Sequence, residues 1–486
     1  MADDSTFVLS LRLETNEEQL AILNQRFRME WHLYNRTVKE ARKRLNKLYK
    51  DSEYKAIMNE YRKAKKQSSK ASLSAEQKQK LKNLRKKYEL GGPHCFEPFV
   101  KNGRFKFKKH IDSHSCQKLA KRVWSSVEKV LFFKGEAIHY QKYTNFRSVE
   151  GKQNTEGIRY VDKKLVWLGL TVPVRIRKKD TYAKECLNSH SIKYCRIKRR
   201  WHKHQWRYYL ELVLAGTPPM KNRTIGKGRV GIDVGPSTIA VVSQANVMLK
   251  ELNDGIDPID KELNHLNRKA DRQRRANNPE NYNADGTIRR NTKSFHRKWI
   301  VSSNQKKTYD RIRTLYQKRV DKLAYFQNEL ASDIVSMGDE IIIERMDFKG
   351  LQKRSKKTEI SEKTGRFKRK KRFGKSIQIH APANLINKVR IRLAYKNKQL
   401  IEVNTTKMKA SQYNHITGEY MSSDLSKRWK ELIPNVKVQR DLYSAFLLFN
   451  AFDTETIDDE LCHQTFENFF DSHNRLIEEL QKEKQE

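Results

Sequence analysis

The stretch "RVGIDVGPSTIAVVS", from Arg229 to Ser243, joins two apolar strands through a turn and carries one acid, Asp233, at the end of the first strand. Gly235 and Pro236 are typical turn residues. A carboxylate at the end of a buried strand is costly unless it pairs with a cation or binds a metal. Asp233 is therefore a candidate functional residue, and an aspartate that caps its own turn is the simpler alternative.

Two further acids lie at the ends of predicted elements. Glu344 ends the β-branched run "DEIIIE", and Asp441 opens the apolar helix "DLYSAFLLFNAF". Three strands, a helical stretch, another strand and a helix follow the order of an RNase H-like sheet, in which such ends converge. Acids there could share two Mg²⁺ ions for phosphodiester hydrolysis. Alternatively, Glu344 could pair with Arg345, and Asp441 could be an ordinary helix N-cap.

The net charge indicates the partner. The 102 Lys and Arg residues exceed the 57 Asp and Glu residues by 45, which predicts binding to a nucleic acid. The cations are spread from Lys39 to Lys437 and no run approaches about 20 apolar residues, so a membrane partner is not expected. The N-terminus "MADDSTFVLS" lacks a secretory pattern, and the five cysteines form no CxxC pair. These features predict a protein with reduced thiols in a cytoplasmic, nucleoid-associated setting.

Hydrophobic periodicity predicts a multidomain α+β protein. "TFVLSLRLE" alternates like a strand with Phe7, Leu9, Leu11 and Leu13 on one side, and mostly basic helices follow, one of them from Ser113 to about Tyr140. Short alternating strands between residues 146 and 214 predict a small barrel or sandwich. Residues 216–228 read as a linker, long basic helices occupy 260–335, and residues 353–376 read as a basic loop.

Three segments carry a resemblance to a known family. "GIDVGPSTIAVVS", "IIIERMDFKGL" and "VQRDLYSAFLL" resemble the RuvC motifs of TnpB, the RNA-guided nuclease of bacterial insertion sequences (transposable elements), and of the related compact type V CRISPR effectors. "FVLSLRLETNEEQLAILNQRF" and "RIKRRWHKHQWRYYLELVL" are similar to other parts of the family. Matches lie along most of residues 6–449, and the three acids are the most specific of them.

The resemblance implies a domain plan and a set of partners. Residues 1–16 and 144–222 would form an oligonucleotide-binding-like β-barrel wedge domain, residues 17–143 a helical recognition domain, and residues 223–486 a RuvC nuclease domain. Asp233, Glu344 and Asp441 would be the catalytic acids, and they would bind two Mg²⁺ ions. The expected partners are a guide RNA and a target double-stranded DNA opened to an RNA–DNA heteroduplex. Both a monomer and a dimer remain possible.

Basic and aromatic residues of the strands around residues 192–215 and of the long helices are expected to contact RNA or DNA. At least half of the strand aromatics should instead belong to the core, because alternation buries one face. The expected contacts are Arg199, Arg200, Trp201, Trp206, Arg268, Arg272, Arg275, Arg297, Lys298, Lys307, Arg311 and Arg440.

The chain also departs from the family pattern. Many members carry a zinc ribbon of two CxxC pairs between the second and third acids, whereas this chain has no cysteine between Cys195 and Cys462. Residues 404–437 are therefore expected to be a degenerate, zinc-free target-nucleic-acid-binding insert, held by packing or by hydrogen bonds of Tyr413 and His415. Tyr443 replaces the usual asparagine two residues after the third acid. Residues 453–486 are expected to be an acidic C-terminal tail.

These features favour a metal-dependent, RNA-guided DNA endonuclease. A nuclease-weak or nuclease-dead RNA-guided DNA-binding repressor of the same family stays open because of Tyr443 and the missing zinc ribbon. A guide-independent RuvC-like resolvase or transposase is disfavoured, since a bare nuclease would not need the long N-terminal regions. The residues do not separate a transposon-encoded protein from a CRISPR-associated one.

Overall fold

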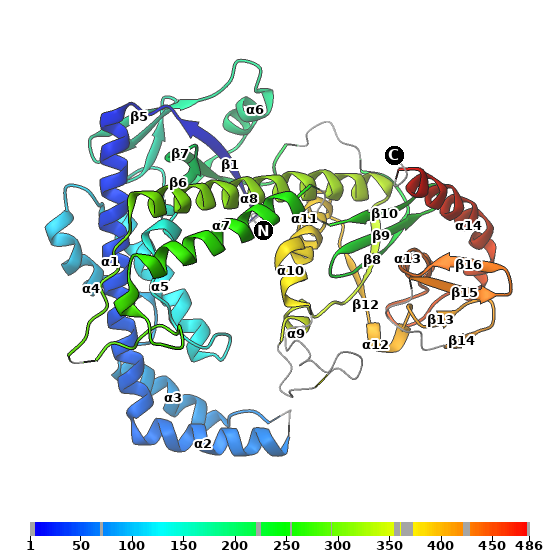
Figure 1. Cartoon of the computed structure of the whole chain (residues 1–486), viewed down its shortest axis with the longest axis horizontal. Helices are drawn as coiled ribbons and strands as arrows, with labels where there is room; N and C mark the ends of the chain where they lie inside the picture. Colours follow the sequence, from blue (N-terminus) through cyan, green and yellow to red (C-terminus); the bar gives the residue numbers. More distant parts are fainter. Residues whose placement is uncertain are drawn as a thin grey trace. The chain divides into compact units, whose positions relative to one another are not determined.

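The structure is a computed structural model of the 486-residue chain. It describes residues 5–68, 71–219, 225–252, 255–292, 294–353, 360, 373–420 and 428–483. The chain contains both helices and sheets and divides into two compact units, Met1–Pro219 and Met220–Glu486, which are described separately (Figure 1). The division falls within the predicted linker. None of the described helices is long and apolar enough to cross a bilayer.

The first unit contains a seven-stranded antiparallel sheet. In β1 (Thr6–Leu13), Phe7, Leu9, Leu11 and Leu13 are buried and the intervening residues are exposed, which confirms the predicted alternation. The strands are ordered β2-β6-β7-β1-β5-β4-β3. Their bounds are β2 (Ser148–Glu150), β3 (Arg159–Val161), β4 (Lys164–Trp167), β5 (Leu170–Arg175), β6 (Ile192–His202) and β7 (Gln205–Ala215).

The helices of the first unit share one hydrophobic core with this sheet. They are α1 (Glu17–Lys50), α2 (Ser52–Gln67), α3 (Ala75–Lys87), α4 (Glu97–Arg104), α5 (Ser113–Leu131) and α6 (Thr181–Ser189). Helix α1 begins with a capping box in which Asn16 and Gln19 bond each other's backbone N–H groups. Helix α5 ends at Leu131 rather than near Tyr140, because Phe133 adopts a left-handed conformation with φ of 59°.

The second unit is built on a five-stranded mixed sheet. Its strands are β8 (Arg229–Val234), β9 (Thr238–Ser243), β10 (Val247–Glu251), β11 (Glu340–Glu344) and β12 (Ile401–Val403), in the order β10-β9-β8-β11-β12. The neighbours β8–β9 and β9–β10 are antiparallel, whereas β8–β11 and β11–β12 are parallel. Strand β8 is therefore central.

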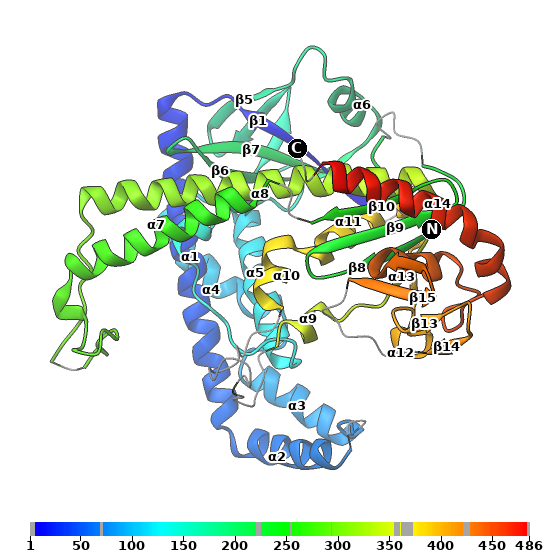
Figure 2. The same cartoon turned by 45° about the vertical axis from the view of Figure 1, so that its right-hand side comes forward.

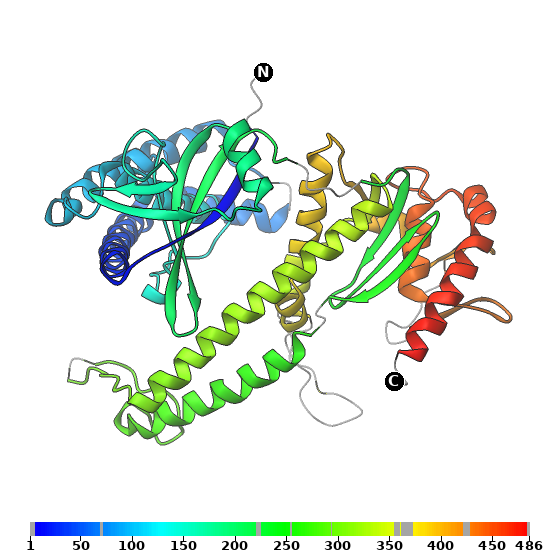
Figure 3. The ribbon, with the colours of Figure 1, turned by 90° about the horizontal axis from the view of Figure 1, so that it is seen from above.

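Helices cover both faces of this sheet (Figure 3). On one face, Val230 and Ile232 of β8 pack with α8 (Ser303–Met337) and α11 (Pro382–Ala394). On the other, Ile342 of β11 packs with residues of α13 (Arg440–Phe449) and α14 (Asp459–Lys482) in a common cluster. Helix α7 (Asp257–Ala276) runs beside α8, and the pair extends beyond the sheet with a small core of its own (Figure 2).

Short elements complete the second unit. They are α9 (Phe348–Leu351), α10 (Gly374–His380), α12 (Thr405–Met408) and the hairpin strands β13 (Tyr413–Asn414), β14 (Glu419–Tyr420), β15 (Trp429–Ile433) and β16 (Val436–Gln439). Most of the expected acidic tail forms α14, which buries Cys462, Phe469 and His473. Most of the predicted basic loop at 353–376 lies outside the described residues.

Candidate active site

Asp233 and Glu344 end neighbouring parallel strands and face the same side of the sheet. Ile232 and Val234 point toward α8 and α11, so the intervening Asp233 points to the opposite face, where α13 lies. The register pairs Ile343 of β11 with Ile232 of β8. Glu344 therefore lies next to Asp233, as predicted for two acids at adjoining strand ends.

Gly231 allows α13 to lie directly on β8. A Cβ atom at this position would lie 2.0 Å from the carbonyl oxygen of Ala445 and 2.3 Å from the backbone nitrogen of Phe449. Only a glycine fits there. Gly231 was not among the residues expected to shape the site, although a glycine inside a buried strand is a known signal of close backbone approach.

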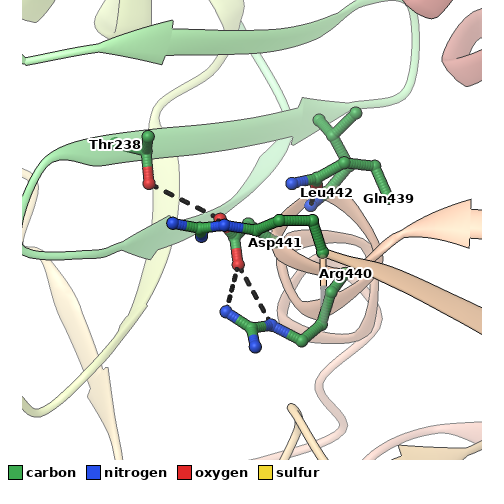
Figure 4. Close-up of polar contacts among 6 residues, drawn as sticks. Thr238, Gln439, Arg440, Asp441 and Leu442 are labelled. Atoms are coloured by element: carbon green, nitrogen blue, oxygen red, sulfur yellow. Dashed lines mark hydrogen bonds and ion pairs between the residues drawn. The ribbon is translucent and has the colours of Figure 1, made fainter. Parts of the chain in front are cut away.

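The third acid, Asp441, lies in the first turn of α13. The N-cap is Gln439, whose side chain accepts a hydrogen bond of 2.7 Å from the N–H of Leu442. The Asp441 carboxylate is therefore not the cap. It accepts a bond from Arg428 Nη1 at 3.2 Å. It also accepts bonds from Arg440 Nη2 at 3.1 Å and Thr238 Oγ1 at 3.5 Å (Figure 4).

Asp233 lies close enough to the other two acids to interact with them electrostatically. Burial, followed by the charges of Glu344 and Asp441, raises the pKa of Asp233 to about 8, and the charge of Arg440 opposes this rise. Burial also raises the pKa of Glu344 to about 7. The alternative pairing of Glu344 with Arg345 is not present among the ion pairs of the described residues. The turn after β8 closes through a backbone bond of 2.9 Å from Gly235 N–H to Thr238 O.

The residue types at this site suit a divalent cation, but the described side chains are not positioned to hold one. Asp233 and Glu344 are partly buried and form no ion pair among the described residues. Together with Asp441 they offer hard oxygen ligands of the kind that Mg²⁺ prefers. However, no three described His, Cys, Asp or Glu side chains are grouped so that they could hold an ion. Asp441 contacts two arginines instead. The two-ion Mg²⁺ site remains a prediction.

The residues expected to contact nucleic acid differ in exposure. Arg200, Trp206, Arg297 and Arg440 are partly buried. Arg268, Arg272, Arg275, Lys298, Lys307 and Arg311 are exposed.

Arg199 and Trp201, which were expected to contact nucleic acid, are buried in the structure. Both side chains are buried because β6 turns them toward the core side. Arg199 is 0% exposed and donates to the carbonyl oxygens of Phe146 at 3.0 Å and Tyr143 at 2.6 Å. Its guanidinium also lies 4.2 Å from the centre of the Trp206 ring. Arg199 therefore has a structural role in the first unit.

Hydrogen bonds hold the hairpin that follows α12. Tyr413 donates its hydroxyl to Asp459 Oδ1 at 2.6 Å. The hydroxyl of Tyr443 accepts from the backbone N–H of His415 at 3.1 Å and bonds His415 Nδ1 at 2.7 Å. Tyr443 is fully buried. Tyr443 therefore supports the hairpin that contains Tyr413 and His415.

Replacing Tyr443 with phenylalanine should lower the free energy of unfolding by about 1–3 kcal/mol, because it leaves two buried groups of His415 unsatisfied. Chemical denaturation of the full chain measures the loss. Tyr420→Phe, on the exposed strand of the same hairpin, is the matched control and should change stability by less than about 0.5 kcal/mol. Equal stability of the two variants would show that the Tyr443 hydroxyl does not support the hairpin.

No protein-family model and no curated protein matches the sequence. Among solved structures, the chain aligns with the cryo-EM structure of a Cas12f1–sgRNA–target DNA complex, with a TM-score of 0.43 and 10% identity over 92% of this chain and 98% of that one. It also aligns with the cryo-EM structure of a CRISPR–Cas12f ternary complex, with a TM-score of 0.23 and 13% identity over 93% and 100%.

Proposed function

We propose that this chain is an RNA-guided, Mg²⁺-dependent DNA endonuclease. The observation that carries the proposal is the placement of Asp233 and Glu344 side by side on parallel strand ends, with Asp441 near enough to raise the pKa of Asp233. The strand order β10-β9-β8-β11-β12, with three antiparallel strands followed by two parallel ones, supports an RNase H-like nuclease domain.

The protein's own residues would hold the reacting groups in place. Asp233, Glu344 and Asp441 would bind two Mg²⁺ ions, which when bound supply an activated water and stabilise the leaving oxygen. Arg428 and Arg440, which now contact Asp441, are suited to hold the phosphate of the strand to be cut. The fixed backbone contact between α13 and β8 keeps Asp441 near the strand ends.

The surface of the second unit fits a partner that is held through its phosphates. Arg268, Arg272 and Arg275 of α7 are exposed, as are Lys307 and Arg311 of α8. Such cations bind the backbone of a nucleic acid without reading its sequence. Sequence would then be read by pairing between a guide RNA and the target strand.

One experiment separates the proposed function from its alternatives. The chain is purified from its native cells, copurifying RNA is sequenced, and DNA that matches this RNA is offered with Mg²⁺. Cleavage of matched DNA alone, abolished by EDTA, is the expected result. Bound RNA with DNA binding but no cleavage would establish the repressor instead. Absence of RNA together with cleavage of branched DNA would establish a resolvase.

The RNA-guided repressor is the second candidate, and one observation favours it. Asp441 is engaged by Arg428 and Arg440, and the described acids do not form an assembled metal site. In the nuclease, Arg428 and Arg440 must break their contacts with the Asp441 carboxylate when metal and substrate bind.

Replacing Arg428 with alanine should therefore raise the affinity of the free protein for a divalent cation. The expected increase is up to about fivefold, which corresponds to the ~1 kcal/mol upper value for an exposed ion pair. Mn²⁺ binding measured by electron paramagnetic resonance provides a readout independent of cleavage. Lys437→Ala, an exposed cation on β16, is the control for net charge. Equal Mn²⁺ affinities would show that Arg428 does not compete for Asp441.

A further inference from the structure

A pocket of about 540 Å³ lies in the first unit, where residues of α1, α5, β2 and β6 meet. Its lining combines cations, serines and an aromatic ring. Lys118, Lys121 and Lys129 come from α5, Ser125 and Ser126 lie on the same helix, and Tyr194 comes from β6. This volume is within the range typical of small-ligand sites.

Glu30 of α1 also lines the pocket, and it is an unusual residue to find there. Its side chain is only 3% exposed, and its buried Oε2 atom has no hydrogen-bond partner among the described residues. Burial, followed by the charge of Asp112, raises the pKa of Glu30 well above its ordinary value. This shift favours the protonated, uncharged form of the carboxyl group. A buried polar atom without a partner requires an explanation, and a ligand that supplies the partner is one.

The neighbouring charged residues do not provide this partner. Arg122 donates to Ser148 O and to Gln141 Oε1, each at 3.3 Å, and its guanidinium lies 4.9 Å from the centre of the Phe146 ring. Glu150 pairs with Arg196 at 2.8 Å. These contacts hold the walls of the pocket in place.

The lysines give the pocket a strongly positive opening. Lys118 is partly buried with its Nζ atom 4.2 Å from the centre of the Tyr194 ring. Lys121 and Lys129 are exposed. A neutral hydrogen-bonding group inside and cations at the opening match a molecule with a polar, uncharged ring and an attached anion, as in a nucleotide.

We propose that this pocket binds a single unstacked nucleotide of a nucleic-acid strand, with the edge of its base hydrogen-bonded to Glu30 and its phosphate bound by Lys118 and Lys121. A neutral carboxyl group presents one donor beside one acceptor. The Watson–Crick edge of each of the four bases has an acceptor beside a donor, so the pocket accepts any base. Lys129 then binds the phosphate of an adjoining nucleotide.

This site is independent of the acids of the second unit, because it needs neither metal nor cleavage. The test uses the full chain, freed of RNA and kept in EDTA. The first probe is 2-aminopurine riboside 5′-monophosphate, and the second is a trinucleotide with 2-aminopurine in its centre. Binding is followed by the fluorescence of the base. The trinucleotide should bind at least tenfold more tightly than the mononucleotide, and equal affinities would overturn the assignment to a strand.

Variants of Glu30 test the contact with the base. Glu30→Gln keeps a donor and an acceptor and should bind the mononucleotide within about threefold of the unaltered protein, whereas Glu30→Leu should bind it at least about tenfold more weakly. Unchanged binding by Glu30→Leu, or the absence of saturable binding by the unaltered protein, would overturn the proposal.

Variants of the lysines test the contact with the phosphate, and they need no change in the core. Lys118→Ala and Lys121→Ala should each weaken mononucleotide binding several-fold. Lys43→Ala, an exposed cation on α1 outside this pocket, should leave it unchanged. Equal effects of all three substitutions would show that the charge acts non-specifically and would contradict the site. Asp233→Asn should leave probe binding unaltered, so failure of this proposal and of the nuclease proposal can be told apart.

Discussion

Asp233→Asn should lower the rate of Mg²⁺-dependent DNA cleavage by about 10³-fold and, in the absence of metal, stabilise the protein. A metal ion contributes several kcal/mol to the transition state, and each 1.36 kcal/mol corresponds to a tenfold change in rate. Cleavage of guide-matched DNA measures the first effect. Unchanged cleavage would remove Asp233 from the catalytic site.

The stability effect should depend on pH. The pKa of Asp233 is raised to about 8 in the folded protein, so the folded state keeps a proton that the unfolded chain releases from about pH 4 upward. The contribution of this group to stability therefore falls as pH rises from about 4 to 8. The Asp233→Asn substitution removes this loss of stability, because an asparagine side chain does not ionise.

Denaturation in EDTA at two pH values measures this stability effect. We expect Asp233→Asn to be more stable than the unaltered chain by roughly 1–3 kcal/mol at pH 8.5, and by a smaller amount at pH 5. Glu431→Gln, an exposed acid on β15, is the control and should show no such difference. A destabilised Asp233→Asn at pH 8.5 would show that the carboxylate is paired and contradict the electrostatic argument.

Gly231→Ala should lower the free energy of unfolding by about 3 kcal/mol or more and abolish cleavage. Its Cβ atom would lie 2.0 Å from the carbonyl oxygen of Ala445, and a backbone atom of a packed helix cannot move aside as a side chain can. Helix α13 must therefore shift away from β8 and take Asp441 with it. Chemical denaturation and the cleavage assay together measure the result.

Gly374→Ala is the matched control for this substitution. The nearest atom to a Cβ at Gly374, outside its chain neighbours, would be 3.6 Å away, which is an ordinary contact. We expect its stability to stay within about 1 kcal/mol of the unaltered protein. If Gly231→Ala behaves like Gly374→Ala, then α13 does not lie as close to β8 as the structure places it.

The periodic features of the sequence predicted the elements around the site well. The alternation of β1, the apolar run of β8 and the apolar helix after Asp441 all correspond to elements of the structure. They succeed because burial of one face follows directly from spacing. The proximity of Asp233 to Glu344 could also be anticipated, since both acids end strands of one sheet.

Other features depend on tertiary contacts that spacing does not reveal. Residues 453–486 were expected to be a tail because they are acidic. The helical spacing of Cys462, Phe469 and His473 could have indicated α14. Because of its charge, Arg199 was expected to contact nucleic acid. Aromatic rings and two carbonyl oxygens instead stabilise its guanidinium inside the first unit. Arg428 lies just before β15 and Asp441 lies in α13. A single sequence does not reveal that their side chains form an ion pair.

Helix α14 also matters for anyone who wishes to shorten this chain or fuse another protein to its end. His473 accepts a hydrogen bond of 2.9 Å from the backbone N–H of Gln439, and the side chain of Gln439 in turn caps the helix that carries Asp441. Truncation before residue 473 would therefore remove a support of the third acid. Compact engineered versions should retain this terminal helix and attach their cargo beyond it.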